Sequence, residues 1–170
     1  MAVLSYLKGN YMEREQKELL LKGKKRALRL LERKDYSRKE LTGKLLKDGY
    51  EEDIVNQIIE YVDSFHYLDD SRVAGSFIRG RKDIKSKREL EFLLKQKGIS
   101  EEEICVAMEE NYKNEDGIAQ EEVAIERHLR KFHVTEEELE KMSYEEKQKI
   151  AAKLYRKGFD SDKIRKMLQM

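Results

Sequence analysis

Three histidines and one cysteine are the residues of this sequence whose chemistry best suits metal binding or catalysis. His128 and His133 are five residues apart, a spacing that does not place two side chains on one face of a helix. The single cysteine, Cys105, stands between apolar residues, which predicts a packed and unreactive thiol. No glycine-rich phosphate loop or nucleophile motif is present. We therefore expect no catalytic residues, no metal and no cofactor, and we expect that the protein is not an enzyme.

Two adjacent aspartates, Asp69 and Asp70, could contribute to a divalent-cation site, but a hard cation needs more oxygen ligands than two carboxylates supply. A simpler role is available, because carboxylates at a helix start accept hydrogen bonds from free backbone N–H groups. The pair is predicted to cap a helix that begins near Ser71. Tyr50 and Tyr67 fall where repeated elements meet, and we expect them to pack in the core and not to stack on bases.

The charged residues nearly cancel in total, 36 basic against 35 acidic, but they are segregated along the chain. Residues 1–49 contain 14 basic and 7 acidic side chains, whereas residues 101–122 contain nine acidic and one basic. Basic residues gathered on one side of a protein attract polyanions. Two basic clusters therefore indicate a DNA-coated or acidic partner, and the alternative is an ordinary solvated helix face. The first cluster is Lys22, Lys24, Lys25, Arg26, Arg29 and Arg33; the second is Arg79, Arg81, Lys82, Lys85, Lys87 and Arg88.

The composition predicts an all-helical chain. Proline is absent, and the charged residues are mostly Glu, Lys and Arg, which form helices well. One cysteine fits a reducing compartment, and no apolar run reaches the roughly 18 residues that span a bilayer. The apolar stretch at residues 2–7 has neither a basic region before it nor a small-residue cleavage site after it. The predicted location is the cytoplasm.

A gapless internal repeat is centred on Gly49, Gly98 and Gly158. Apolar residues recur eight and four positions before each glycine, and again one, six, nine and ten positions after it. These offsets predict two amphipathic helices joined by a glycine in the left-handed conformation. Three S-x-x-E capping patterns open the first helix of each pair, at Ser37, Ser86 and Ser143; the third lies 15 residues before its glycine instead of 12, so that helix should be one turn longer.

A further helix is predicted before each pair, at about residues 13–34, 70–82 and 118–132. The predicted fold is all-α, with three tandem three-helix repeats that form an elongated, curved helical array. A single compact helical bundle is the alternative. The expected divisions are a tail or the start of the first helix at 1–21 and repeats at 22–66, 67–114 and 115–170.

Characteristic residues run through the central repeat: Tyr67, Leu68, Asp69 and Asp70, then Arg72, Phe77, Arg79 and Arg81, then Glu89, Leu90, Lys97, Gly98 and Ile99. This combination resembles the central signature of the RecX family of regulatory proteins. Residues 27–49 resemble that family's first repeat, and the likeness extends over about residues 24–170. The segment between Arg81 and Leu90 departs from the family, which often has a glycine-proline turn there, and the third repeat matches loosely.

The resemblance to RecX implies a regulator of RecA, active in DNA repair, homologous recombination and the SOS response. Such a protein would bind the RecA–single-stranded DNA filament as a monomer and modulate, most simply inhibit, the ATPase, recombinase and coprotease activities of RecA. Residues expected to contact RecA or DNA are Arg26, Arg29, Arg33, Tyr67, Asp70, Arg72, Arg79, Arg81, Lys82, Lys85, Lys87 and Arg88. The alternatives are a general nucleic-acid-binding helical module and a helical-repeat adaptor for another protein.

Overall fold

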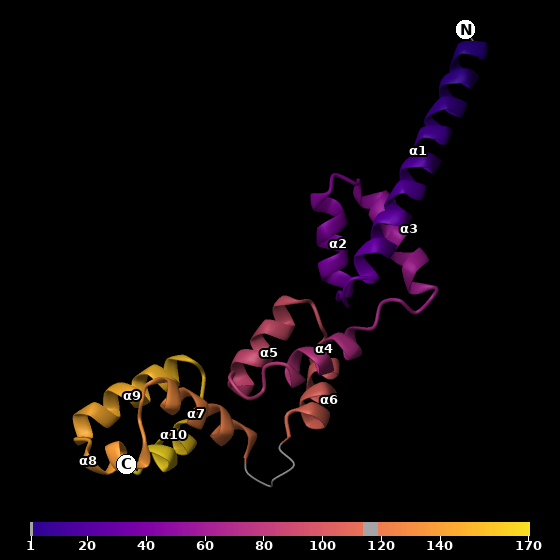
Figure 1. The fold of residues 1–170 in the computed structure, drawn as a ribbon. Helices are drawn as coiled ribbons and strands as arrows, with labels where there is room; N and C mark the ends of the chain where they lie inside the picture. Colours follow the sequence, from indigo (N-terminus) through magenta and orange to yellow (C-terminus); the bar gives the residue numbers. More distant parts are fainter. Residues whose placement is uncertain (1, 114–118) are drawn as a thin grey trace. The chain divides into compact units, whose positions relative to one another are not determined.

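The computed structural model is helical throughout: the described residues, 2–113 and 119–170, contain ten helices and no strand (Figure 1). Side chains are described from residue 14 onward within these ranges. No helix of the described ranges is long and apolar enough to cross a membrane. The all-α prediction is confirmed. The helices are α1 (Ala2–Leu31), α2 (Arg38–Lys47), α3 (Glu52–Asp63), α4 (Asp70–Arg79), α5 (Lys87–Gln96), α6 (Glu101–Asn111), α7 (Gln120–Lys131), α8 (Glu136–Lys141), α9 (Tyr144–Arg156) and α10 (Ser161–Leu168).

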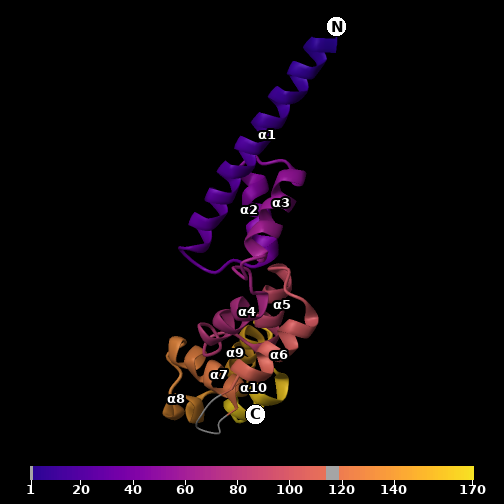
Figure 2. The same cartoon turned by 90° about the vertical axis from the view of Figure 1, so that its right-hand side faces the viewer.

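The helices divide into two compact units: unit 1 comprises Met1–Val73 and unit 2 comprises Ala74–Met170. In unit 1, α1 packs along α3, and α2 lies against both (Figure 2). In unit 2, α5 pairs with α6, and α10 packs against α7 and α9. The division falls inside α4, after its first turn, so α4 contributes to both units.

Three helical hairpins repeat along the chain, and each turns at a glycine in the left-handed region. The φ angles are +94° at Gly49, +80° at Gly98 and +84° at Gly158. In each hairpin the residue after the glycine donates its N–H to a carbonyl five residues back, with N–O distances of 3.3, 3.3 and 3.4 Å. This pattern closes a helix when a residue without a Cβ follows it. The predicted helical repeat is confirmed at all three glycines.

Capping side chains start the helices as the sequence predicts. Ser37 and Ser143 form complete capping boxes with the glutamates three residues later. The Ser86 hydroxyl accepts the N–H of Glu89, whereas the Glu89 carboxylate pairs with Lys85. These contacts satisfy N–H groups that would otherwise lack partners at a helix start.

Each unit buries its own hydrophobic core. The three equivalent leucines, Leu45, Leu94 and Leu154, are completely buried, as the repeat alignment predicts. Complete burial of one leucine side chain stabilises a fold by about 1.5–3 kcal/mol. Leu45 belongs to the core of unit 1 and Leu154 to a core of unit 2.

The structure adds detail at the ends of the repeats. The first helix begins at Ala2, so residues 2–21 form the start of α1. The third repeat contains a short additional helix, α8, opened by a capping box at Thr135 that the sequence analysis did not detect. The longer first helix predicted for the third hairpin is confirmed, because α9 has 13 residues against 10 in α2 and α5. The expected boundary at residues 114 and 115, like the expected helix start at residue 118, lies outside the described residues.

The prediction for Cys105 is wrong. The buried face of α6 carries Ile104, Ala107 and Met108, and Cys105 lies on the exposed face of the helix. An apolar neighbour at the next position does not share a helix face, because successive residues are about 100° apart.

Candidate binding surfaces

The second basic cluster occupies the end of α4, the following loop and the start of α5. We call residues 80–88 the basic loop. Three basic side chains in and beside it are used within the fold. The Arg79 guanidinium donates to Asn111 Oδ1 at 2.5 Å, the Lys82 ammonium donates to the carbonyl of Lys113, and Lys85 pairs with Glu89. These three have structural roles that reduce their availability to a partner.

Three other basic side chains of this cluster point their charges outward. The Arg81 guanidinium lies 4.1 Å from the centre of the Phe77 ring, a contact that orients the charge without neutralising it. Lys87 is 3.9 Å from Glu91, at the limit of an ion pair. Arg88 is exposed and forms no ion pair with another described residue. Arg81, Lys87 and Arg88 are therefore the strongest candidates for contacting a partner.

Buried polar side chains join the basic loop to the third repeat: Gln120 and His128 come from the third repeat, and Ser86 comes from the loop itself. Gln120 donates to Asp83 Oδ1 at 3.0 Å and to the carbonyl of Lys82 at 3.3 Å. His128 Nε2 lies 2.9 Å from the carbonyl of Ile84, and Ser86 Oγ donates to the carbonyl of Lys157 at 2.8 Å. Gln120, His128 and Ser86 are 6%, 7% and 0% exposed. Because these contacts are directional, the loop is ordered before any partner binds.

His128 is a structural residue in this arrangement. Burial lowers the pKa of its imidazole, the positive charges of Lys157 and Lys131 act in the same direction, and the Ile84 carbonyl opposes them. A neutral ring that carries its proton on Nε2 can donate to this carbonyl. The Phe159 ring meets the imidazole edge to face, with 5.4 Å between centroids.

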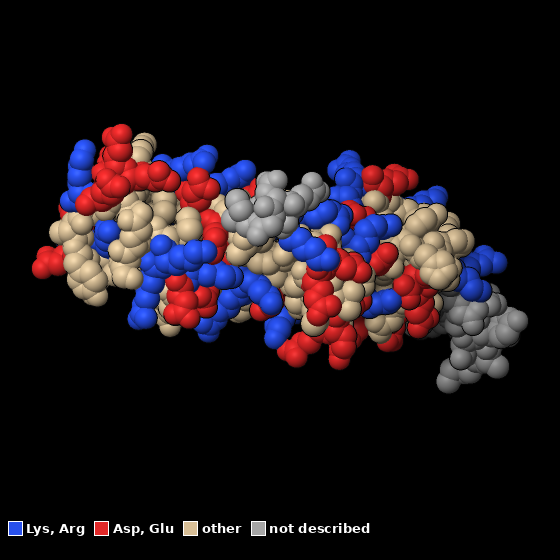
Figure 3. Space-filling view, turned by 90° about the horizontal axis from the view of Figure 1, so that it is seen from below, with Lys and Arg blue, Asp and Glu red and all other residues tan. Residues whose placement is uncertain are grey.

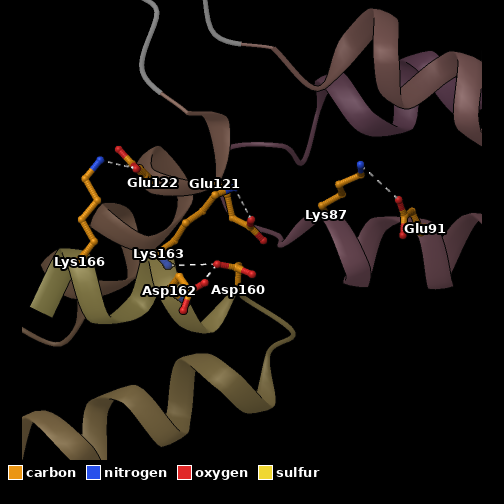
Figure 4. A network of polar contacts seen from close by, with 8 residues as sticks. All are labelled: Lys87, Glu91, Glu121, Glu122, Asp160, Asp162, Lys163 and Lys166. Atoms are coloured by element: carbon orange, nitrogen blue, oxygen red, sulfur yellow. Dashed lines mark hydrogen bonds and ion pairs between the residues drawn. The ribbon is translucent and has the colours of Figure 1, made fainter. Parts of the chain in front are cut away.

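The acidic side chains near the basic loop are paired with lysines of the third repeat (Figure 4). Glu121, only 5% exposed, accepts from Lys163 at 2.9 Å, and Glu122 accepts from Lys166 at 2.8 Å. Asp160 accepts two backbone N–H groups at the start of α10. These carboxylates are compensated locally, so they weaken the positive field of the basic loop less than their number suggests.

The first basic cluster lies on α1 and, at Arg33, just after it; some of its side chains have partners within unit 1 and others do not. Arg26 pairs with Asp48 at 2.7 Å, and this hydrogen bond lowers the pKa of the Asp48 carboxyl. The Lys24 ammonium lies 4.2 Å from the centre of the Tyr61 ring. Arg29 and Arg33 are exposed and make no ion pair with another described residue. Lys25 is exposed in the same way, so Lys25, Arg29 and Arg33 are the members of this cluster that remain available.

The segment Tyr67–Asp70 is mainly the end of the connection between α3 and α4. Asp69 accepts the N–H of Arg72 at 2.8 Å, so the predicted cap at this helix start is confirmed for Asp69. Asp70 instead accepts the N–H of Arg38 at 2.9 Å, at the beginning of α2. The Arg72 guanidinium pairs with Asp35 at 2.9 Å. Asp70 and Arg72, both predicted to bind a partner, thus have structural roles in unit 1.

Tyr67 does not pack in the core, contrary to the prediction. Its side chain is 47% exposed and stacks on Phe65, whereas Tyr50 packs partly buried against the core of unit 1. The difference follows from Leu68, which enters the core in place of its neighbour and directs Tyr67 outward.

The sequence analysis missed Gln120 and Ser86 as residues that shape the basic loop, and it considered His128 only as a metal ligand. Their partners lie 37 to 71 positions away in the chain, and most are backbone carbonyls, which have no sequence signature. A polar residue on the apolar face of a predicted helix, such as Gln120 or His128, was the available signal.

Basic and acidic side chains are interspersed on the face that Figure 3 shows. The charge blocks of the sequence therefore do not become large areas of one sign on this face. Across the described part of the chain, no three His, Cys, Asp or Glu side chains are grouped as metal ligands would be. The exposed basic side chains of the two clusters can form electrostatic contacts with a macromolecule.

Comparisons of the sequence with known proteins identify the family. The RecX first three-helix domain matches residues 24–61, and the RecX third three-helix domain matches residues 120–168. The regulatory protein RecX of Prosthecochloris aestuarii is 30% identical over 145 residues, which cover 84% of this chain and 89% of the relative. The RecX protein of Clostridium perfringens is 30% identical over 142 residues, 84% of this chain, but the matched part spans only 65% of that relative.

Solved structures agree in fold. The crystal structure of RecX from Lactobacillus salivarius has a TM-score of 0.67 at 24% identity, covering 88% of this chain and 94% of that one. A second crystal structure of a regulatory protein RecX has a TM-score of 0.75 at 21% identity, covering 95% and 77%. Two matched RecX domains and 30% identity across most of a RecX relative show that this chain belongs to the RecX family.

Proposed function

We propose that this chain is a RecX-like regulator that binds RecA–single-stranded DNA filaments and inhibits the ATPase, recombinase and coprotease activities of RecA. RecX membership supports a regulatory role, since the relatives are named regulatory proteins. RecA is the partner that the RecX resemblance implies. The observation that carries the proposal is the basic loop. Gln120 and His128 bind its backbone carbonyls, and its own Ser86 bonds to the carbonyl of Lys157. Arg81, Lys87 and Arg88 of this loop are exposed to solvent.

The basic loop suits a partner that presents phosphates or carboxylates. An arginine guanidinium can form two parallel hydrogen bonds with either group, and the ordered loop reduces the conformational entropy lost on binding. Arg29 at the end of α1 and Arg33 just after this helix supply a second set of basic contacts. Several weak contacts on one filament add to a stronger attachment than any single contact.

The proposal also covers the chemistry, the oligomeric state, the location and the repeats of the protein. The protein acts without catalysis or a cofactor, as a monomer in the cytoplasm. The repeats at residues 22–66, 67–114 and 115–170 are its structural modules. Their boundaries stay predictions.

Reversal of the three outward charges tests the proposal. The variant Arg81→Glu, Lys87→Glu, Arg88→Glu should keep its helicity and melting temperature, because these side chains form no buried ion pair. It should lose most of its co-sedimentation with RecA–single-stranded DNA filaments and most of its inhibition of RecA ATPase. Binding by the parent should weaken steeply as salt is raised.

A matched variant separates the position of the charge from its amount. Lys141→Glu, Lys149→Glu, Arg165→Glu reverses three exposed charges of the third repeat and should inhibit RecA as the parent does. Equal inhibition by the basic-loop variant would contradict the proposed site. Equal binding to single-stranded DNA with and without RecA would favour a general nucleic-acid-binding module, and binding to neither would favour an adaptor for another protein.

A further inference from the structure

One aromatic ring of α4, that of Phe77, contacts two basic side chains of unit 2. The Arg81 guanidinium lies 4.1 Å from the centre of this ring, and the Lys97 ammonium lies 5.3 Å from it. Arg81 belongs to the basic loop, whereas Lys97 is the C-cap of α5. A cation over the face of an aromatic ring is attracted by the negative charge density of that face. Phe77 therefore connects the basic loop with the turn that follows α5.

The backbone around Phe77 and Arg81 is ordered. The N–H of Arg81 donates to the carbonyl of Ile78 at 2.9 Å, and the Arg81 carbonyl accepts the N–H of Ile84 at 3.0 Å. Phe77 is half-buried, and the next residue, Ile78, is completely buried. The ring is thus a fixed platform, and the freedom that it can restrict is that of the Arg81 side chain.

The ring restricts Arg81 without neutralising its charge. Arg81 is exposed and forms no ion pair with another described residue. An arginine over a ring stays positively charged, and its guanidinium can still donate N–H groups to a carboxylate or a phosphate. A side chain that is already restricted loses less conformational entropy when a partner binds. The contact with Phe77 should therefore strengthen binding through Arg81.

The carboxylates closest in the chain to these two cations have other partners. Asp83 accepts from Gln120 and pairs with Arg127 at 3.4 Å. Glu101 pairs with Lys95 at 2.5 Å, and this hydrogen bond lowers the pKa of the Glu101 carboxyl. Neither carboxylate competes with the ring for the Arg81 guanidinium.

We propose that Phe77 is a positioning residue of the binding site: its ring holds the Arg81 guanidinium in place for contact with the filament. This inference deepens the proposed function and rests on it. Lys97 lies against the same ring, so Phe77 also brings a second cation close to Arg81. The alternative is that the ring only packs. Its removal would then lower stability and leave the contact made by Arg81 unchanged.

A double-mutant cycle separates positioning from packing. Phe77→Leu keeps an apolar side chain and removes the π face, whereas Arg81→Gln removes the charge that this face holds. Phe77→Leu should weaken co-sedimentation with RecA–single-stranded DNA filaments about three- to tenfold. In a chain that already carries Arg81→Gln, the same change should have no further effect. Phe77→Tyr restores an aromatic ring and should bind as the parent does.

Phe132→Leu is the matched control. Phe132 is also half-buried in unit 2, and the Lys153 ammonium lies 5.3 Å from the centre of its ring. This variant should lower the melting temperature much as Phe77→Leu does, but it should bind the filament as the parent does. Equal weakening by Phe77→Leu with and without Arg81→Gln would overturn the inference, and so would equal weakening by Phe132→Leu.

A measurement on the free protein tests the inference without any partner. Nitrogen-15 NMR relaxation at Arg81 Nε should report an ordered side chain in the parent and in Phe77→Tyr, and a more mobile one in Phe77→Leu. Equal mobility in the parent and in Phe77→Leu would overturn the inference. An ordered Arg81 in a parent that does not bind the filament would instead contradict the proposed function, so the two failures are distinguishable.

Discussion

The aromatic connection (residues 64–69) and the basic loop (residues 80–88) present different side chains and are held in different ways. The aromatic connection is anchored by one apolar side chain, Leu68, and by hydrogen bonds to nearby residues of unit 1. The basic loop is anchored by Gln120, His128 and Ser86, through hydrogen bonds that reach across unit 2.

This difference shows two ways to keep an exposed segment ordered. An apolar anchor is non-directional and insensitive to pH, whereas hydrogen bonds fix the positions of individual carbonyls and depend on protonation. In both segments several backbone polar groups form hydrogen bonds inside the protein. Exposed side chains such as Tyr67 and Arg88 are therefore held by an ordered backbone.

Removal of the apolar anchor should have the largest effect. Leu68→Ala should lower the free energy of unfolding by about 3 kcal/mol, because it deletes buried methyl groups and leaves a cavity in unit 1. Urea denaturation followed by circular dichroism measures this loss. Leu46→Ala, at a side chain that is 44% exposed, is the control and should cost much less. Similar losses for both leucines would show that Leu68 is no anchor.

Removal of a directional anchor should cost somewhat less. Ser86→Ala deletes the cap of α5 and leaves the carbonyl of Lys157 without its donor, so we expect a loss of about 2 kcal/mol in the same assay. Ser100→Ala removes a cap on α6 that has only local partners, and it should cost about half as much. If the two variants lose equal stability, the hydrogen bond to Lys157 contributes nothing to holding the basic loop.

Stability should depend on pH through His128, a hydrogen-bonding anchor of the basic loop, and not through Leu68, the apolar anchor of the aromatic connection. The pKa of His128 is lowered in the folded protein from its ordinary 6.5, so the unfolded chain takes up a proton first as pH falls. The contribution of His128 to stability is therefore complete above about pH 6.5 and is lost as pH falls toward the lowered value. His128→Gln keeps a donor for the Ile84 carbonyl and cannot titrate. Between about pH 7.5 and about pH 5, the melting temperature of this variant should fall less with pH than that of the parent. The same dependence of melting temperature on pH in both proteins would contradict this role of His128.

The smallest effect should come from the strained turn of the aromatic connection. His66→Gly places a residue without a Cβ at a φ of +56° and should stabilise the protein by about 0.5–1 kcal/mol. His133, with a φ of +58° after α7, provides the matching substitution in unit 2. Thermal melting checks both. A loss of stability in either variant would show that the imidazole itself contributes to the turn.

Local patterns predicted most of the fold. Gly49, Gly98 and Gly158 marked the three hairpin turns, and Ser37 and Ser143 marked helix starts, because caps and turns depend on residues within one helical turn. Cys105 was assigned to the wrong face because its neighbours were considered without the helical period.

The sequence by itself determined most of the helices, the repeat and the family resemblance, since these follow from composition and from contacts between residues close in the chain. Only the tertiary structure decided which charged side chains stay available. Arg79 and Lys82 are occupied by partners 32 and 31 positions away, whereas Arg81 and Arg88, from the same cluster, are exposed. Identical residue types in one short segment thus acquire different roles, because long-range packing determines which side chains meet a protein partner and which meet water.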